Sequence, residues 1–167
     1  MIDRKVGTAL GMAVVVVVLD HVTKYVVEQT MTLHETIPLL PFFSLTYVRN
    51  TGAAFGILGD LPAMVRLPLF LGVAVFAIVA LASYLREVRT DETTVVVALG
   101  GILGGAFGNL VDRLRYGEVV DFLHLHYRGY DWPMFNVADS AITVGVAVVL
   151  LHSLRGRPNG VPATEGR

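Results

Sequence analysis

The chain has 167 residues, of which 54% are hydrophobic and 16% are charged. This composition is too apolar for an ordinary soluble domain, and the chain is long enough for only a few membrane spans. A net charge of -1 gives no basic excess, which argues against nucleic acid as a partner. Because the sequence contains no cysteine, disulfides, thiolate nucleophiles and cysteine-type zinc sites are excluded.

Four apolar stretches approach the roughly 20 residues that a helix needs to cross the hydrocarbon core of a bilayer. They cover residues 6–27, 65–85, 94–114 and 137–154. Four spans place both termini on one side of the membrane. That side holds Arg4, Lys5, Arg86, Arg89, Arg155, Arg157 and Arg167, close to span ends or in short segments, and the other side holds Lys24, Arg49, Arg66, Arg113, Arg115 and Arg128. The positive-inside rule therefore predicts cytoplasmic termini.

The first span, residues 6–27, has two interpretations. Arg4 and Lys5 followed by an apolar run are also typical of a secretory signal peptide, but no small-residue cleavage site follows. The helical pattern instead continues through Asp20 and Lys24, which lie four residues apart and share a helix face. This pair predicts either a salt bridge at the membrane interface or a contribution to a functional site.

Residues 28–64 are predicted to form a cap outside the membrane. Alternating β-branched and aromatic residues predict a strand over residues 42–48. Asn50 and Gly52 indicate a turn directly after that strand. Residues 55–64 are expected to form a short helix that lies on the membrane surface.

The third span carries glycines at four-residue intervals, a pattern that lets neighbouring helices pack closely: Gly100, Gly104 and Gly108. Asn109 and Arg113 lie one turn apart on one face, near the outer end of this span. Asp112 and Arg115 are expected at the membrane interface.

Residues 115–136 are predicted to form a second outer loop, with Tyr130 and Trp132 as aromatic anchors at headgroup level. Within it, His124 and His126 alternate with apolar residues as in an interfacial strand, which disfavours the alternative of a metal site there. The tail from residue 155 to residue 167 is expected to be disordered.

Two aspartates are the strongest functional signal in the chain. Asp121 interrupts the apolar segment Val119–Leu123, and Asp139 opens the fourth span. An ionisable group at membrane depth costs about 2.5–3.5 kcal/mol on insertion scales. A favourable interaction with the helix N-terminus, which Asn136 is placed to cap, is the simpler explanation for Asp139. Asp121 requires either a buried partner or a catalytic role.

Two carboxyl groups within hydrogen-bond reach cannot both ionise, so they hold one proton between them, as an aspartic protease requires. Other peptidase chemistries fit less well. No second histidine follows His34-Glu35 at the zinc-protease spacing, and no serine lies in a Gly-x-Ser-x-Gly turn. A presenilin-type site requires Gly-x-Gly-Asp, but Ile57 occupies the first position before Gly59-Asp60.

Five sequence blocks together resemble the motif series of bacterial lipoprotein signal peptidase (signal peptidase II). In chain order they are Asp20-His21-Val22-Thr23-Lys24, Arg49-Asn50-Thr51-Gly52-Ala53-Ala54-Phe55, Gly108-Asn109-Leu110-Val111-Asp112-Arg113-Leu114, Val120-Asp121-Phe122 and Phe135-Asn136-Val137-Ala138-Asp139-Ser140. Any one block is weak evidence, but five in order with compatible spacing form a specific signal.

The resemblance implies a mainly α membrane protein, a four-transmembrane-helix bundle with a small extracytoplasmic β-cradle. It implies an aspartic endopeptidase of the bacterial cytoplasmic membrane that cuts prolipoproteins just before their diacylglyceryl-modified cysteine, with no metal or organic cofactor. Asp121 and Asp139 would be the catalytic dyad. Substrate-binding residues would be Asn50, Gly52, Asn109, Arg113 and Asn136, with Asp20 and Lys24 holding the first span and the cap. The expected partners are the lipidated substrate and membrane phospholipid, and the enzyme is expected to act as a monomer.

Two rival functions use the same acidic residues differently. A proton- or cation-coupled carrier would relay ions through Asp20, Asp121 and Asp139. A scaffold would use the acids only to brace its loops. Cleavage of a lipidated precursor by the purified chain separates the peptidase from both.

Overall fold

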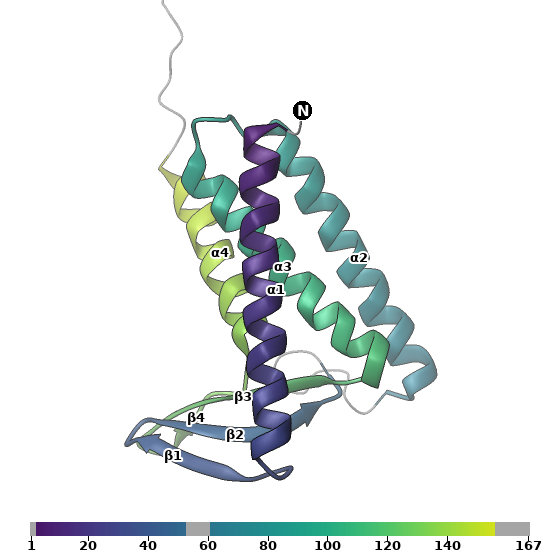
Figure 1. The fold of residues 1–167 in the computed structure, drawn as a ribbon, viewed down its shortest axis with the longest axis vertical. Coiled ribbons are helices and arrows are strands. Elements are labelled where there is room, and N and C mark those ends of the chain that lie inside the picture. Colours follow the sequence, from purple (N-terminus) through teal and green to yellow (C-terminus); the bar gives the residue numbers. More distant parts are fainter. Residues whose placement is uncertain (1–2, 53–60, 156–167) are drawn as a thin grey trace, which may run out of the picture.

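The computed structural model describes residues 3–52 and 61–155, which form four long helices with a small sheet at one end of the bundle (Figure 1). The helices are α1 (Arg4–Thr30), α2 (Ala63–Glu87), α3 (Thr93–Tyr116) and α4 (Val137–Leu154). All four are long and apolar enough to cross a membrane. The predicted mainly α fold with four spans and a small sheet is confirmed. The expected surface helix at 55–64 falls largely outside the described residues, as does the tail from residue 156.

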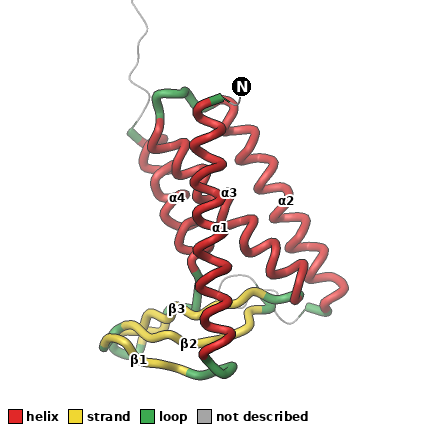
Figure 2. Tube along the Cα trace, viewed as in Figure 1, coloured by secondary structure: helices red, strands yellow, loops and turns green. Residues whose placement is uncertain are grey.

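Helix α3 occupies the centre of the bundle, between α1, α2 and α4 (Figures 1 and 2). Its glycines allow this position. A Cβ on Gly104 would lie 2.6 Å from the carbonyl oxygen of Ala13 in α1, and a Cβ on Gly100 would lie 2.5 Å from that of Ala9. The backbones of α1 and α3 therefore touch directly, as small-residue packing in membranes permits. The other helices keep large apolar side chains on the outside, where lipid would surround them.

The sheet has four antiparallel strands in the order β1 (Thr36–Leu40), β2 (Phe43–Asn50), β3 (Val119–Tyr127) and β4 (Tyr130–Asp131). The sequence predicted the second of these, over residues 42–48, and indicated strand-like alternation around His124 and His126 in the third. Strands β3 and β4 come from the segment expected to be an outer loop, residues 115–136. Gly117 makes this change of direction possible, because it ends α3 in the left-handed conformation with a φ of 73°.

The inner face of the sheet packs on the end of α1. Val120 and Phe122 of β3 form a buried cluster with Val27, Met31 and Tyr47. An ion pair between Arg49 of β2 and Glu28 of α1 joins the same two elements at 2.5 Å. The orientation of the sheet, and of Asp121 within it, is therefore fixed relative to the first helix.

The segment that connects β3 to α4 runs back beside β3. Phe135 pairs with Leu123 through backbone hydrogen bonds in both directions, Leu123 N–H to Phe135 C=O at 2.8 Å and Phe135 N–H to Leu123 C=O at 3.0 Å. This pairing places the start of α4 beside the middle of β3. Asp121 and Asp139, 18 residues apart in sequence, are brought together in this way.

We expect Gly104→Ala to destabilise the protein by about 1–3 kcal/mol, because the added methyl group meets the backbone of Ala13 and forces α1 and α3 apart. Gly72→Ala in α2 is the matched control, since nothing lies within 4 Å of a Cβ there and alanine favours a helix. Thermal unfolding in detergent measures both. Equal midpoints for the two variants would contradict the close contact between α1 and α3.

Candidate active site

Asp121 and Asp139 line one cavity at the end of the bundle where the sheet lies. Asp121 lies on β3 and is 1% exposed, and Asp139 occupies the first turn of α4, where it is half-buried. Among the described contacts no hydrogen bond joins the two carboxylates directly. They are instead linked through Asn136, which contacts both.

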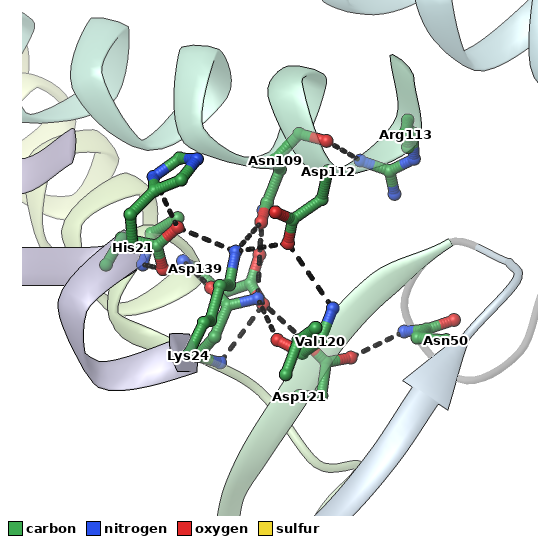
Figure 3. A network of polar contacts seen from close by, with 12 residues as sticks. His21, Lys24, Asn50, Asn109, Asp112, Arg113, Val120, Asp121 and Asp139 are labelled. Atoms are coloured by element: carbon green, nitrogen blue, oxygen red, sulfur yellow. Dashed lines mark hydrogen bonds and ion pairs between the residues drawn. The ribbon is translucent and has the colours of Figure 1, made fainter. Parts of the chain in front are cut away.

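The carboxylate of Asp121 accepts two side-chain amide hydrogen bonds, from Asn136 Nδ2 at 2.7 Å and from Asn50 Nδ2 at 2.8 Å (Figure 3). Burial, together with the negative charge of Asp139, raises the pKa of Asp121 to about 7. The two amide hydrogen bonds and the charge of Lys24 oppose this rise. Burial prevails, so Asp121 titrates near neutral pH.

The carboxylate of Asp139 has different surroundings. Its Oδ1 accepts from Asn109 Nδ2 at 2.7 Å, and its Oδ2 accepts from the backbone N–H of Asn136 at 3.3 Å. Asn136 caps α4 and Asp139 closes a reciprocal capping box three residues later. The positive end of the α4 dipole therefore favours an ionised Asp139.

Three asparagine amides face these carboxylates, and each is oriented by a donor on its oxygen side. The Gly52 N–H donates to Asn50 Oδ1 at 2.9 Å, and the Asp139 N–H donates to Asn136 Oδ1 at 2.9 Å. Lys24 Nζ donates to Asn109 Oδ1 at 3.1 Å. Since a backbone N–H and an ammonium can only donate, each amide must turn its NH2 group toward a carboxylate.

Lys24 lies at the centre of a buried charge cluster between α1 and α3 (Figure 3). Its ammonium contacts Asp20 Oδ2 at 2.6 Å and Asp112 Oδ2 at 2.8 Å, in addition to Asn109. Asp20 also accepts from the Ala138 N–H at 2.9 Å, and Asp112 accepts from the Val120 N–H at 3.3 Å. The cluster thus connects α1, α3, β3 and α4 at one point.

Asp112 is the member of this site that the sequence interpretation missed. It was expected at the membrane interface, but it is 3% exposed and paired with Lys24. The spacing in the sequence could have indicated this position, because residues three apart share a helix face and Asp112 lies three residues after Asn109. Both side chains contact Lys24. Arg115, three residues further, is exposed.

The cavity has a volume of about 1070 Å³ and is lined by polar residues at one side and apolar residues at the other. Arg113 lies in its wall, where its guanidinium donates to the Gly52 carbonyl at 3.4 Å and lies 5.0 Å from the centre of the Phe70 ring. The apolar wall comes from β3, the return segment and α4: Leu125, Trp132, Met134, Phe135, Ile142 and Val144.

The structure places the residues singled out in the sequence at two depths. Asn50, Gly52, Asn109 and Arg113 line the cavity with the two aspartates. Asn136 was expected to contact substrate, but it is completely buried and lies behind the carboxylates that it connects.

No group of three or more histidine, cysteine or acidic side chains suited to a metal ion occurs within residues 3–52 and 61–155. His124 and His126, considered as ligands, contact the sheet instead. His124 Nδ1 lies 3.2 Å from Thr46 Oγ1, and His124 Nε2 lies 3.1 Å from Asp131 Oδ1. His126 Nε2 lies 2.9 Å from Ser44 Oγ.

Comparison with known proteins gives a consistent answer. The family described as Signal peptidase (SPase) II matches residues 12–155. The chain belongs to the signal peptidase II family. A protein named Lipoprotein signal peptidase from Syntrophotalea carbinolica is 49% identical over 147 residues, covering 87% of this chain and 90% of the relative. The protein of the same name from Geobacter sulfurreducens is 46% identical over 146 residues, covering 87% and 90%.

A solved structure described as a bacterial membrane enzyme superposes with a TM-score of 0.82 at 35% sequence identity, and covers 96% of this chain and 95% of that one. Family membership makes the protein a peptidase, and its four helices make it a multi-pass membrane protein. Family membership therefore favours the peptidase over the carrier and the scaffold.

We expect Lys24→Met to destabilise this signal peptidase by about 3–5 kcal/mol, because it leaves the carboxylates of Asp20 and Asp112 buried without their cation. Arg89→Met is the control. Its ion pair with Asp91 is exposed on both sides, so solvent already screens it and no loss is expected. Thermal unfolding in detergent reports both, and a Lys24→Met protein as stable as wild type would refute the argument.

Proposed function

We propose that the enzyme removes the signal peptide from diacylglyceryl-modified prolipoproteins by cutting before the lipidated cysteine, with Asp121 and Asp139 as its catalytic pair. The observation that carries the proposal is a pair of carboxylates with contrasting surroundings on one cavity of a membrane peptidase. The names of the curated relatives, Lipoprotein signal peptidase, support this class of substrate.

At neutral pH, Asp121 holds the proton and Asp139 is ionised. The pKa of about 7 at Asp121 supports the first assignment. The second is supported by the α4 N-terminus and by the Lys24–Asn109–Asp139 series of contacts, which brings positive charge toward Asp139. Neighbouring carboxyl groups with different environments divide acid and base roles in this way.

In the reaction, Asp139 takes a proton from a water molecule as the water oxygen attacks the scissile carbonyl carbon. Asp121 donates a hydrogen bond to the carbonyl oxygen and then its proton, giving a neutral tetrahedral diol. The C–N bond breaks as the proton on Asp139 passes to the leaving nitrogen. The diol becomes the carboxylic acid end of the signal peptide, and its released proton restores Asp121.

The cavity walls suit a lipidated peptide. Arg113 and Asn50 provide hydrogen-bond donors beside the carboxylates, where an extended backbone would present carbonyl groups. Ile142 and Val144 on α4 form an apolar wall suited to acyl chains. The lipid supplies affinity through burial, so small residues before the cysteine are sufficient.

The membrane arrangement is part of the same proposal. Lys5, Arg86 and Arg155 lie at the end of the bundle opposite the sheet, which supports cytoplasmic termini in a bacterial inner membrane. The catalytic pair then lies near the outer face. We propose a monomer surrounded by phospholipid that uses no metal or organic cofactor.

Asp121→Asn and Asp139→Asn are each expected to reduce cleavage at least about a hundredfold, because each variant lacks one of the two carboxyl groups that transfer protons. Asp131→Asn, on the exposed β4, is the control and should retain activity. The assay uses the purified chain with a prolipoprotein that bears or lacks its diacylglyceryl group. Cleavage by either catalytic variant, or cleavage independent of the lipid, would refute the proposal.

The pH profile provides a separate test. Asp121 is protonated below its pKa of about 7, so the acid form is lost and kcat/KM falls as the pH rises through that value. Asn50→Ala removes a hydrogen bond that stabilises the ionised form, so the decline should move to higher pH. A decline that moves to lower pH in Asn50→Ala would show that Asp121 is not the acid.

A further inference from the structure

A second cavity, of about 310 Å³, lies on the other face of β3 from the catalytic pair. Alternate residues of the strand separate the two cavities: Val119 and Asp121 line the first, and Val120 lines the second. Its other walls come from residues 21–28 of α1 and from the last turn of α3. Nothing in the proposed cleavage reaction uses this space.

The lining of this cavity includes two cations, two tyrosines and two acids: Lys24, Arg115, Tyr25, Tyr116, Glu28 and Asp112. Arg49 lines the first cavity. The guanidinium groups of Arg49 and Arg115 both face the Tyr116 ring, at 4.8 and 5.1 Å from its centre. Arg49 is neutralised by Glu28. Arg115 makes neither an ion pair nor a side-chain hydrogen bond with any residue in the described part of the chain, which leaves one cation at the rim available to an anion.

The acidic residues around the cavity are already engaged. Asp112, at its floor, accepts hydrogen bonds from Lys24 and from the Val120 N–H. The ring nitrogen Nδ1 of His21 must carry its hydrogen, since it bonds the Val17 carbonyl at 3.0 Å. Its Nε2 has no partner among residues 3–52 and 61–155.

The cavity continues into an apolar stripe on α1. Val18, Val22 and Tyr25 follow one another at helical spacing and are 53%, 54% and 62% exposed. Val22 and Tyr25 also line the cavity. The charges of Glu28 and Asp112 are paired, so Arg115 is the one lining cation without an ion pair in the described part of the chain. A pocket with this cation at the end of two spanning helices, continuous with an apolar stripe that runs into the span, matches a molecule with a phosphate at one end and acyl chains at the other.

We propose that this cavity binds one anionic phospholipid, with its phosphate at Arg115 and an acyl chain along the α1 stripe. The bound lipid lies against the Lys24–Asp112 cluster and Val120, directly behind Asp121. It therefore supports the wall of the active site without contacting substrate. This inference rests on the spanning helices and not on the catalytic roles of the aspartates.

The test titrates phosphatidylglycerol into the purified full-length protein in detergent and counts bound lipid by native mass spectrometry, so that no cleavage is required. Wild type and Arg128→Gln, a control on the exposed turn after β3, should bind one lipid with equal affinity. Arg115→Gln should weaken binding roughly fivefold to tenfold. Arg115→Lys should retain most of the affinity, since the charge remains.

Val22→Trp tests the cavity without changing any charge, because the indole fills the space beside Tyr25. It too should lose the bound lipid, and circular dichroism should show the helices intact in every variant. Equal binding by all variants would refute the site. Inorganic phosphate that displaces the lipid at the same concentration as phosphatidylglycerol itself would show an anion site without lipid selectivity, and would overturn the proposed occupant.

Discussion

The ammonium of Lys24 has three hydrogens, and the structure provides three acceptors, on Asp20, Asp112 and Asn109. A cation and two carboxylates this deeply buried are stable only together, because removing any one leaves an uncompensated charge in a low-dielectric interior. Asp20 belongs to α1 and also binds the start of α4 through the Ala138 N–H. Asp112 and Asn109 belong to α3, and Asp112 also binds β3 through the Val120 N–H. The requirement to satisfy one lysine thus fixes α1, α3, β3 and the start of α4 relative to one another.

The same lysine determines the direction of hydrogen bonds at the proposed catalytic pair. Because Lys24 occupies the oxygen of Asn109, the Asn109 NH2 group must face Asp139, and Asn136 donates to the same oxygen while it donates to Asp121. Both carboxylates therefore receive hydrogen bonds that favour ionisation. For Asp121, burial and the charge of Asp139 outweigh those hydrogen bonds and raise its pKa to about 7. This net rise places the titration of a buried carboxyl group near neutral pH.

Much of this arrangement could be predicted from the sequence, where local rules suffice. Four apolar runs of span length gave the helices, helical spacing gave the pairing of Asp20 with Lys24, and Asn136 was expected to cap α4. The segment of β3 was placed in an outer loop, with strand-like alternation noted only around His124 and His126. Its extent was not predicted because its pairing with β2 joins residues about 70–80 positions apart in sequence. The burial of Asp112 was missed because it depends on how close α1 approaches α3, which only the packing at the glycines determines.

The two carboxylates come from elements of different kinds, so different local interactions act on their charges. Asp139 begins a helix, so the helix dipole and a capping box act on its charge whatever the rest of the site does. Asp121 lies on a strand, which has almost no net dipole, so burial, its side-chain partners and the charges of Asp139 and Lys24 act on it instead. A cavity bounded by a helix start on one side and a strand on the other therefore presents unequal acids to a bond between them. Ile142 and Val144 of the spanning helix α4 also line that cavity, so in the proposed reaction a lipid-anchored substrate would reach the acids from within the membrane.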